Sequence, residues 1–170
     1  MPTPIGHALG GLVAGALVVG PGASDVAIGA RRGKVAVICG LFAMLPDIDL
    51  LFGGHRRMTH SLGAVVVAVV LVAVIDRRRP VVWIAAGAAY CSHLLLDWLS
   101  DDTSPPLGLM ALWPFDSTFY QSPYSVFYPV CRQYWLVDCW VDLSVAIAWE
   151  LALLGPLALA AMLLTRRARR

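Results

Sequence analysis

Sparse charge within long apolar runs constrains this chain more than any other feature of its sequence. Only 14% of the 170 residues are charged, whereas 59% are hydrophobic, and the mean hydropathy is +0.72. A soluble domain carries roughly 25% charged residues to solvate its surface. The chain is therefore predicted to be an integral membrane protein whose outer surface faces lipid. Its length favours a single membrane-embedded domain over residues 1–170.

Five apolar segments are expected to form helices. They cover residues 5–20, 34–52, 61–75, 80–100 and 141–165. The last two are long enough to cross a bilayer, which takes roughly 20 helical residues. The first three are shorter, so each could instead be a buried or re-entrant helix, and their glycines and alanines suit close packing in lipid. The predicted fold class is an all-α, polytopic membrane helix bundle of about five helices.

Basic residues mark one side of this bundle. Ten of the 13 lysines and arginines lie in three clusters, at residues 31–34, 77–79 and 166–170. With five helices, all three clusters fall on the same side, and short loops rich in Lys and Arg stay in the cytoplasm. We therefore expect a cell (inner) membrane protein with its N-terminus outside and its C-terminus inside. The loop at 53–60 and the segment 101–140 would then lie outside.

The segment 101–140 has an unusual composition. Counted with Trp98, it holds 11 of the 16 aromatic residues, and its five prolines argue against one continuous helix. Aromatic rings suit the headgroup zone of a membrane. The segment is expected to be interfacial, either as a lid over the residues beneath it or as a plain loop.

The four cysteines divide into two pairs by position. None of them forms a C-x-x-C motif of the kind that a zinc ribbon uses. Cys131 and Cys139 lie in the outer segment and could form a disulfide in an oxidising compartment. Cys39 and Cys91 lie inside apolar helices and are expected to be packing residues.

Histidines and aspartates at the predicted outer ends of the helices carry the candidate chemistry. All four histidines and three carboxylates belong to this set: His7, His55, His60 and His93, with Asp47, Asp49 and Asp97. Asp97 follows His93 by four residues, so the two side chains share one helix face. Each residue alone could be a cap or an interfacial side chain. The whole set is harder to explain as caps and interfacial side chains, because ionisable groups at membrane depth are costly and usually mark function.

Mixed nitrogen and oxygen ligands favour a divalent metal, with zinc first and manganese or iron as alternatives. The predicted ligands of one or two ions are His7, Asp47, Asp49, His60, His93 and Asp97. Thr59 or Ser61 could cap the following helix and so aim His60 at the site. The guanidinium groups of Arg56 and Arg57 could hold a pair of phosphate oxygens, or could contact lipid headgroups.

Four motifs carry a resemblance to a known family. They are Leu45-Pro46-Asp47-Ile48-Asp49, the string of His55-Arg56 and Thr59-His60-Ser61, His93-x-x-x-Asp97, and Leu112-Trp113-Pro114-Phe115. Between His7 and about Phe115, the chain resembles the YdjM-like family of membrane-bound metal-dependent hydrolases. The resemblance implies a multi-helix inner-membrane hydrolase, distantly similar to zinc-dependent phospholipase C and P1-type nucleases. The His-x-x-x-Glu of those enzymes is not matched, since Ala146 lies four residues before Glu150, so Glu150 is a tentative site residue.

The sequence therefore predicts a membrane-bound metal-dependent hydrolase that cleaves a phosphoester of a lipid or another amphiphilic small molecule. A metal-activated water would attack the phosphorus or carbonyl centre. Asp47 or Asp49 could act as the base, and His55 or Arg56 could stabilise the developing negative charge. Two alternatives stay open: a non-catalytic membrane protein or regulator with a structural metal, and a metal-ion transporter. The short basic runs suit membrane topology better than nucleic-acid binding, and the oligomeric state is open.

Overall fold

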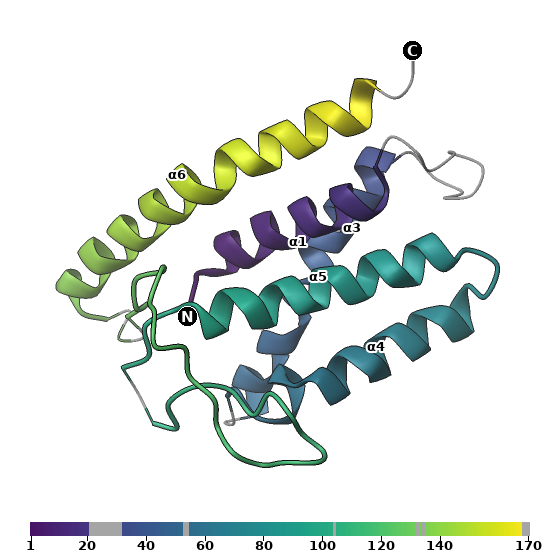
Figure 1. The fold of residues 1–170 in the computed structure, drawn as a ribbon. Helices are drawn as coiled ribbons and strands as arrows, with labels where there is room; N and C mark the ends of the chain where they lie inside the picture. The colour runs from purple at the N-terminus through teal and green to yellow at the C-terminus, as the bar shows by residue number, and fades with distance from the viewer. Residues whose placement is uncertain (21–31, 53–54, 104, 132, 134, 168–170) are drawn as a thin grey trace.

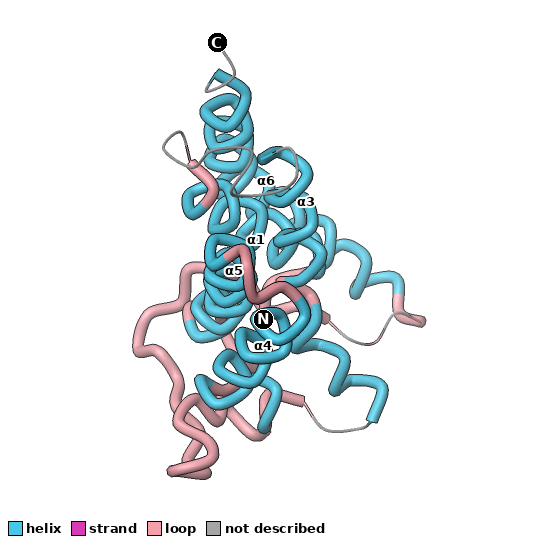
Figure 2. The backbone as a smooth tube through the Cα atoms, turned by 90° about the vertical axis from the view of Figure 1, so that its right-hand side faces the viewer, coloured by secondary structure: helices cyan, strands magenta, loops and turns pink. Residues whose placement is uncertain are grey.

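The helices of the computed structural model confirm the predicted all-α fold. The structure describes residues 1–20, 32–52, 55–103, 105–131, 133 and 135–167. Within these residues the five α-helices and two 3₁₀ helices are, in chain order, α1 (Pro4–Val18), α3 (Arg32–Phe42), η1 (Leu45–Phe52), η2 (Met58–His60), α4 (Leu62–Ile75), α5 (Pro80–Trp98) and α6 (Val137–Arg167). The described residues form no strand, only two isolated bridges between loop residues (Figure 2).

Helix α1 lies at the centre of the bundle. It packs against α3, α5 and α6, while α4 packs against α5 on the side away from α1 (Figure 1). Glycines permit the close approach of α1 and α3. A Cβ atom at Gly15 would lie 2.5 Å from Cβ of Cys39, and one at Gly40 would lie 2.8 Å from the Ala8 carbonyl oxygen. The small residues therefore have the packing role that the sequence predicts.

The helix ends gather at two opposite ends of the bundle. The N-terminus lies at one end together with the long connection between α5 and α6, and the C-terminus lies at the other (Figure 1). The beginning of α3, with Arg32 and Lys34, and the arginines at 77–79 lie at the C-terminal end. The described parts of the basic clusters thus share one end, as predicted. Which end faces the cytoplasm stays a prediction.

Three helices of the described chain are long and apolar enough to cross a membrane, judged by length and composition. They are Arg32–Phe52, Pro80–Trp98 and Val137–Thr165, and the shorter apolar helices are Pro4–Val18 and Leu62–Ile75. For the first three predicted segments the sequence left open whether they span or are buried or re-entrant helices, and the second of them reaches spanning length when η1 is counted with α3. The last helix begins earlier than predicted, at Val137 rather than at residue 141.

The segment predicted as one helix over residues 34–52 is divided in two. Helix α3 ends at Phe42, and the 3₁₀ helix η1 begins at Leu45. Pro46 accounts for the division, because a proline disfavours the α conformation in the residue before it. With about three residues per turn, Pro46 and Asp49 lie on one face of η1, and both are buried. The division therefore turns the Asp49 carboxylate into the protein.

The described part of the segment 101–140 is irregular up to α6, as its prolines predict. It covers the beginning of α4: the Leu62 amide donates to the Ala111 carbonyl at 2.9 Å, and the Gly63 amide donates to the Trp113 carbonyl at 3.2 Å. Five of its described aromatic side chains are at least half exposed: Phe115, Tyr124, Tyr128, Trp135 and Trp140. Their place at a membrane interface stays a prediction.

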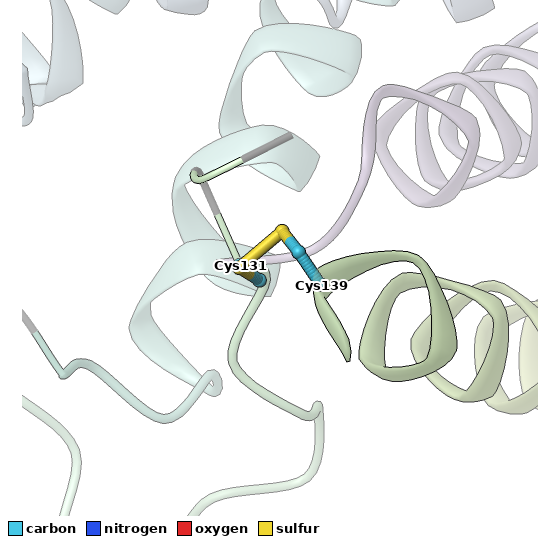
Figure 3. Close-up of a disulfide and its surroundings, with 2 residues drawn as sticks. All are labelled: Cys131 and Cys139. Carbon is cyan, nitrogen blue, oxygen red and sulfur yellow. A yellow bond between two sulfur atoms is a disulfide. The ribbon is translucent and has the colours of Figure 1, made fainter. Parts of the chain in front are cut away.

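The predicted cysteine pair is confirmed. A disulfide joins Cys131 in the outer segment to Cys139 in the first turns of α6 (Figure 3). Cys39 is buried, as expected of a packing residue, whereas Cys91 is exposed on the surface of α5. The expectation that both free cysteines pack inside the bundle is therefore wrong for Cys91.

Candidate metal centre

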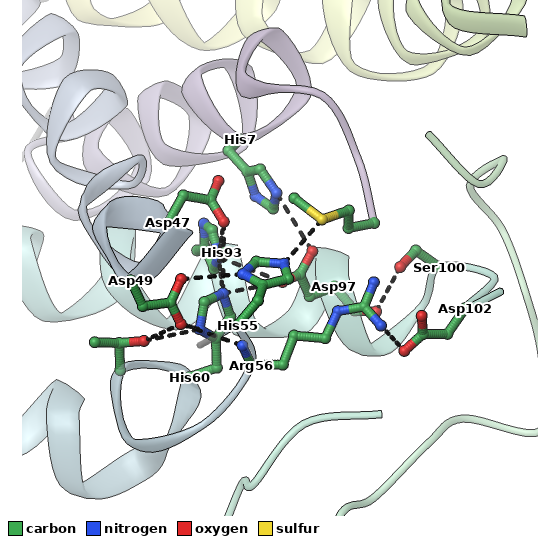
Figure 4. Close-up of polar contacts among 12 residues, drawn as sticks. His7, Asp47, Asp49, His55, Arg56, His60, His93, Asp97, Ser100 and Asp102 are labelled. Atoms are coloured by element: carbon green, nitrogen blue, oxygen red, sulfur yellow. Dashed lines mark hydrogen bonds and ion pairs between the residues drawn. The ribbon is translucent and has the colours of Figure 1, made fainter. Parts of the chain in front are cut away.

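Side chains from four elements meet at the end of the bundle where the N-terminus lies (Figure 4). They come from α1, η1, η2 and the last turns of α5: His7, Asp47, Asp49, His60, His93 and Asp97. The structure thus brings the six predicted ligands together. Ser61, one of the two predicted caps, accepts a hydrogen bond from the Ala64 amide at 3.1 Å and so begins α4 directly after His60.

Two fully buried imidazoles face each other at the middle of the cluster. The Nε2 atoms of His60 and His93 are 3.0 Å apart. Nδ1 of His93 lies 2.7 Å from the Ala43 carbonyl oxygen, which can only accept, so Nδ1 carries the hydrogen. Nδ1 of His60 lies 3.2 Å from a carboxylate oxygen of Asp49 and carries its hydrogen for the same reason. Both Nε2 atoms therefore point a lone pair at the same place, and these repel each other unless a proton or a metal cation lies between them.

Two carboxylates complete this arrangement. Oδ2 of Asp97 lies 3.4 Å from Nε2 of each histidine, and Oδ1 of Asp47 lies 3.5 Å from His60 and 3.7 Å from His93. Among the described residues, neither oxygen has a hydrogen-bond partner, although both are buried. A buried carboxylate oxygen without a donor is costly. A bound cation would remove that cost.

The spacing of these four atoms suits a tetrahedral metal. Zinc binds histidine and carboxylate ligands at roughly 2.0–2.1 Å, which places neighbouring ligand atoms about 3.3 Å apart. The contacts within the cluster range from 3.0 to 3.7 Å. All four ligand atoms lie within 4.8 Å of one another. The residues present therefore fit a divalent ion held by Asp47, His60, His93 and Asp97.

The electrostatics of the cluster also favour a cation. Burial lowers the pKa of His60, but Asp47, Asp49 and Asp97 surround the ring and raise that pKa to about 10. Without a metal, the site thus holds a proton far above the ordinary titration range of histidine. A divalent ion would take over that positive charge.

His7 lies beside the four ligands. Its ring stacks on that of His93, with centroids 3.8 Å apart and an angle of 21° between the planes. Its Nε2 is 3.3 Å from Oδ1 of Asp97, and no hydrogen bond reaches either ring nitrogen within the described structure. His7 therefore extends the cluster beside His93 and Asp97, although it belongs to neither group of residues that could hold one ion together.

Asp49 lies behind His60, with both of its oxygens engaged. Oδ1 is 3.0 Å from Nδ1 of His55, and Oδ2 accepts from the Thr59 hydroxyl at 2.7 Å and the Arg56 amide at 3.2 Å. Asp49, His55 and His60 also form a second group that could hold a metal ion. The geometry at His60 is that of a carboxylate that orients a metal-binding histidine through its outer nitrogen.

The other predicted site residues have different surroundings. Arg56 adopts a left-handed backbone conformation with φ of 63°, and its guanidinium forms a buried ion pair with Asp102. Glu150 is buried in α6 and accepts hydrogen bonds from the amide and hydroxyl of Thr3, at the beginning of α1. Glu150 therefore joins α1 to α6 and belongs to neither group of possible metal ligands.

Several partners in the site were not predicted from the sequence, among them Sδ of Met1, which lies 2.9 Å from Nε2 of His55. Ala43 contributes only a carbonyl group, which leaves no signal in a sequence. Asp102 lies in a pair of aspartates just after α5, and its position could have suggested a partner for Arg56. Thr59 was considered only as a helix cap, but its hydroxyl contacts both Asp49 and His60.

The sequence matches the family model of the YdjM inner membrane protein over residues 1–169. The chain belongs to the YdjM inner membrane protein family. This confirms the resemblance seen in the motifs and extends it over the outer segment and α6. No curated protein and no solved structure matches the chain. The chain is therefore a member of an inner-membrane family, and its own buried His and Asp groups could hold a metal ion.

Proposed function

We propose that this YdjM protein is a membrane-bound metal-dependent hydrolase that cleaves a phosphoester of an amphiphilic substrate. One observation supports this most: two buried Nε2 lone pairs converge at metal-ligand spacing with two carboxylate oxygens that have no donor in the described part of the chain. Ionisable groups at this depth of a membrane protein are costly and are usually retained for function.

Asp47, His60, His93 and Asp97 would hold the first ion, and His7 is placed for an additional contact or a second ion. Zinc suits this nitrogen and oxygen set best, with manganese or iron as alternatives. When bound, a divalent ion would supply an acidified water and an electrophile for a phosphoryl oxygen. Asp47 retains 14% of its side-chain exposure while the other three ligands are fully enclosed, so substrate would approach from the Asp47 side.

His55 is the better proton acceptor among the predicted catalytic residues. Asp49 lies 3.0 Å from its Nδ1, and Sδ of Met1 lies 2.9 Å from its Nε2. Water would displace the Met1 side chain before Nε2 could accept a proton. In hydrolysis the water oxygen forms a bond to phosphorus as the ester P–O bond breaks. The water proton would pass to Nε2 of His55 and then to the leaving alcohol. Arg56, fixed by Asp102, would favour the negative charge that develops on the phosphate.

Hydrolysis of phosphatidic acid and of a soluble aryl phosphodiester by the purified protein tests this proposal. We expect turnover that requires a divalent metal, is lost in Asp97→Asn and persists in Cys91→Ser. Cys91 is a suitable control because it lies on the same helix but is exposed. Turnover in Asp97→Asn at the wild-type rate would contradict the proposal.

A structural metal site is the second candidate, and one observation favours it. Structural zinc sites are closed by four protein ligands, and four buried or nearly buried side chains meet here. In that case, metal removal would lower the melting temperature, and no phosphoester would be hydrolysed by the metal-loaded protein.

A further inference from the structure

An apolar groove runs along α4 and ends beside the metal centre. Its volume is about 570 Å³. One wall is formed by α4 side chains that recur at helical spacing, among them Ala64, Val67, Leu71 and Ile75. We call this feature the α4 groove. Val67, Leu71 and Ile75 are each more than half exposed, so within a bilayer the groove is open to lipid.

The end of the α4 groove nearest the N-terminus of the helix is polar. Thr59 lines it there, and its hydroxyl contacts both Asp49 and His60. Tyr90 forms part of the lining and donates its hydroxyl to the Thr59 carbonyl at 2.7 Å. Thr59 contacts the outer nitrogen of His60, Nδ1, which faces away from the proposed ion. Leu45 and Ile48 of η1, which lie on either side of Asp47 in the sequence, also line the groove. The groove therefore ends beside the part of η1 that carries Asp47.

We propose that the α4 groove holds an acyl chain of a phospholipid substrate while the phosphate of that lipid lies at the metal centre. This inference rests on the proposed function, because it names the substrate class of the same site. Apart from Thr59, Tyr90 and Trp113, the side chains that line the groove are apolar, and the site is rich in carboxylates and imidazoles. An amphiphile would match both features, its hydrocarbon chain the groove and its anionic, metal-binding headgroup the metal centre.

The length of the groove suits one lipid chain. From Ala64 to Ile75 the helix rises roughly 16 Å at about 1.5 Å per residue. The hydrocarbon core of a bilayer is roughly 30 Å thick, so a chain from one leaflet fills about half of it. A chain that extends along α4 from the site would therefore end near the bilayer centre.

The groove would orient the lipid rather than add much to its binding free energy. A hydrocarbon chain gains little by leaving lipid for an apolar wall, because both surroundings are apolar. Holding the chain along α4 would instead fix where the phosphate lies relative to His60 and Asp47, which is the advantage that orientation gives to catalysis.

The test uses the full-length protein in lipid nanodiscs with a phosphatidic acid that carries a diazirine in the middle of one acyl chain. Light-induced crosslinks should map to residues 64–75. Val67→Phe and Leu71→Phe would occupy the groove in place of the acyl chain and should reduce crosslinking to residues 64–75 about tenfold. Val66→Phe is the matched control, because Val66 is an exposed neighbour that does not line the groove.

Crosslinks spread evenly over the lipid-facing helices, or unchanged in both groove variants, would overturn the proposal. Turnover of a soluble aryl phosphodiester measured beside this separates the two ideas. Groove-confined labelling without any turnover would support the lipid site and refute the hydrolase. Turnover with evenly spread labelling would retain the hydrolase and refute the groove.

Discussion

Replacing Asp49 by Asn should weaken metal binding without abolishing it. The Asp49 carboxylate accepts from the Thr59 hydroxyl at 2.7 Å and the Arg56 amide at 3.2 Å, and it lies 3.2 Å from Nδ1 of His60. Asn keeps the shape but loses the charge that orients His60 and makes it a better ligand. Loss of such an outer carboxylate typically lowers metal affinity 10–100-fold, or roughly 1.4–2.8 kcal/mol.

The assay is competition for zinc between the purified protein and a fluorescent chelator of known affinity. Wild type, Asp49→Asn and Asp97→Asn would be compared, since Asp97 is a predicted direct ligand whose oxygens receive no hydrogen bond from the described residues. We expect a graded series: full affinity, affinity lowered 10–100-fold, and no measurable binding. If Asp49→Asn lost one of two bound ions outright, Asp49 would be a ligand rather than an orienting residue. Unchanged affinity would refute the role of Asp49 altogether.

Three further predictions concern the pKa of His60, the packing at Gly15 and the hydrogen bonds of Glu150. In the metal-free protein, burial lowers the pKa of His60, but the surrounding carboxylates raise it from 6.5 to about 10. Protonated His60 therefore stabilises the folded state, fully below its unfolded pKa of 6.5 and less and less as the pH rises toward 10. The melting temperature of the chelated protein should fall between these two pH values, and a rise would contradict the prediction. Gly15→Ala places a Cβ 2.5 Å from Cβ of Cys39 and should cost roughly 1–3 kcal/mol of stability in thermal unfolding, whereas Gly155→Ala meets nothing within 4 Å and should not destabilise. Glu150→Ala leaves the buried amide and hydroxyl of Thr3 without an acceptor and should cost roughly 1–3 kcal/mol with unchanged metal content; loss of metal would make Glu150 part of the site.

The sequence was sufficient to predict the helical bundle and the set of residues that gather at one of its ends. Long apolar runs with basic residues at alternate ends specify how the helices connect, because charge cannot be placed cheaply in lipid. Since those connections bring the beginnings of α1 and α4 to the ends of α3 and α5, the convergence of His7, His60 and His93 followed from topology alone.

The different roles of the aspartates in the cluster could not be predicted from the sequence. Asp47 and Asp49 are two residues apart in one motif and look equivalent in the sequence. The 3₁₀ geometry after Pro46 gives them different directions, so that Asp47 faces the two Nε2 atoms while Asp49 contacts the outer nitrogen of His60. Such a difference depends on backbone conformation rather than on residue type.

The hydrogen-bond partner of Glu150 could not be predicted either. A carboxylate inside an apolar helix is costly and so suggests function. Its partner is the backbone and hydroxyl of Thr3, which lies 147 residues away in the sequence. A polar residue of this ordinary type, close to the N-terminus, gives no sign that it will satisfy a carboxylate in the last helix.

The central claim is that Asp47, His60, His93 and Asp97 bind a divalent metal. Elemental mass spectrometry of the purified protein, wild type beside His93→Ala and the Cys91→Ser control, tests it most directly. We predict at least one equivalent of zinc, manganese or iron in wild type and control, and its loss in His93→Ala. Absence of metal from all three proteins, even after reconstitution with each ion, would contradict the account and leave a protonated cluster that only packs the helix ends together.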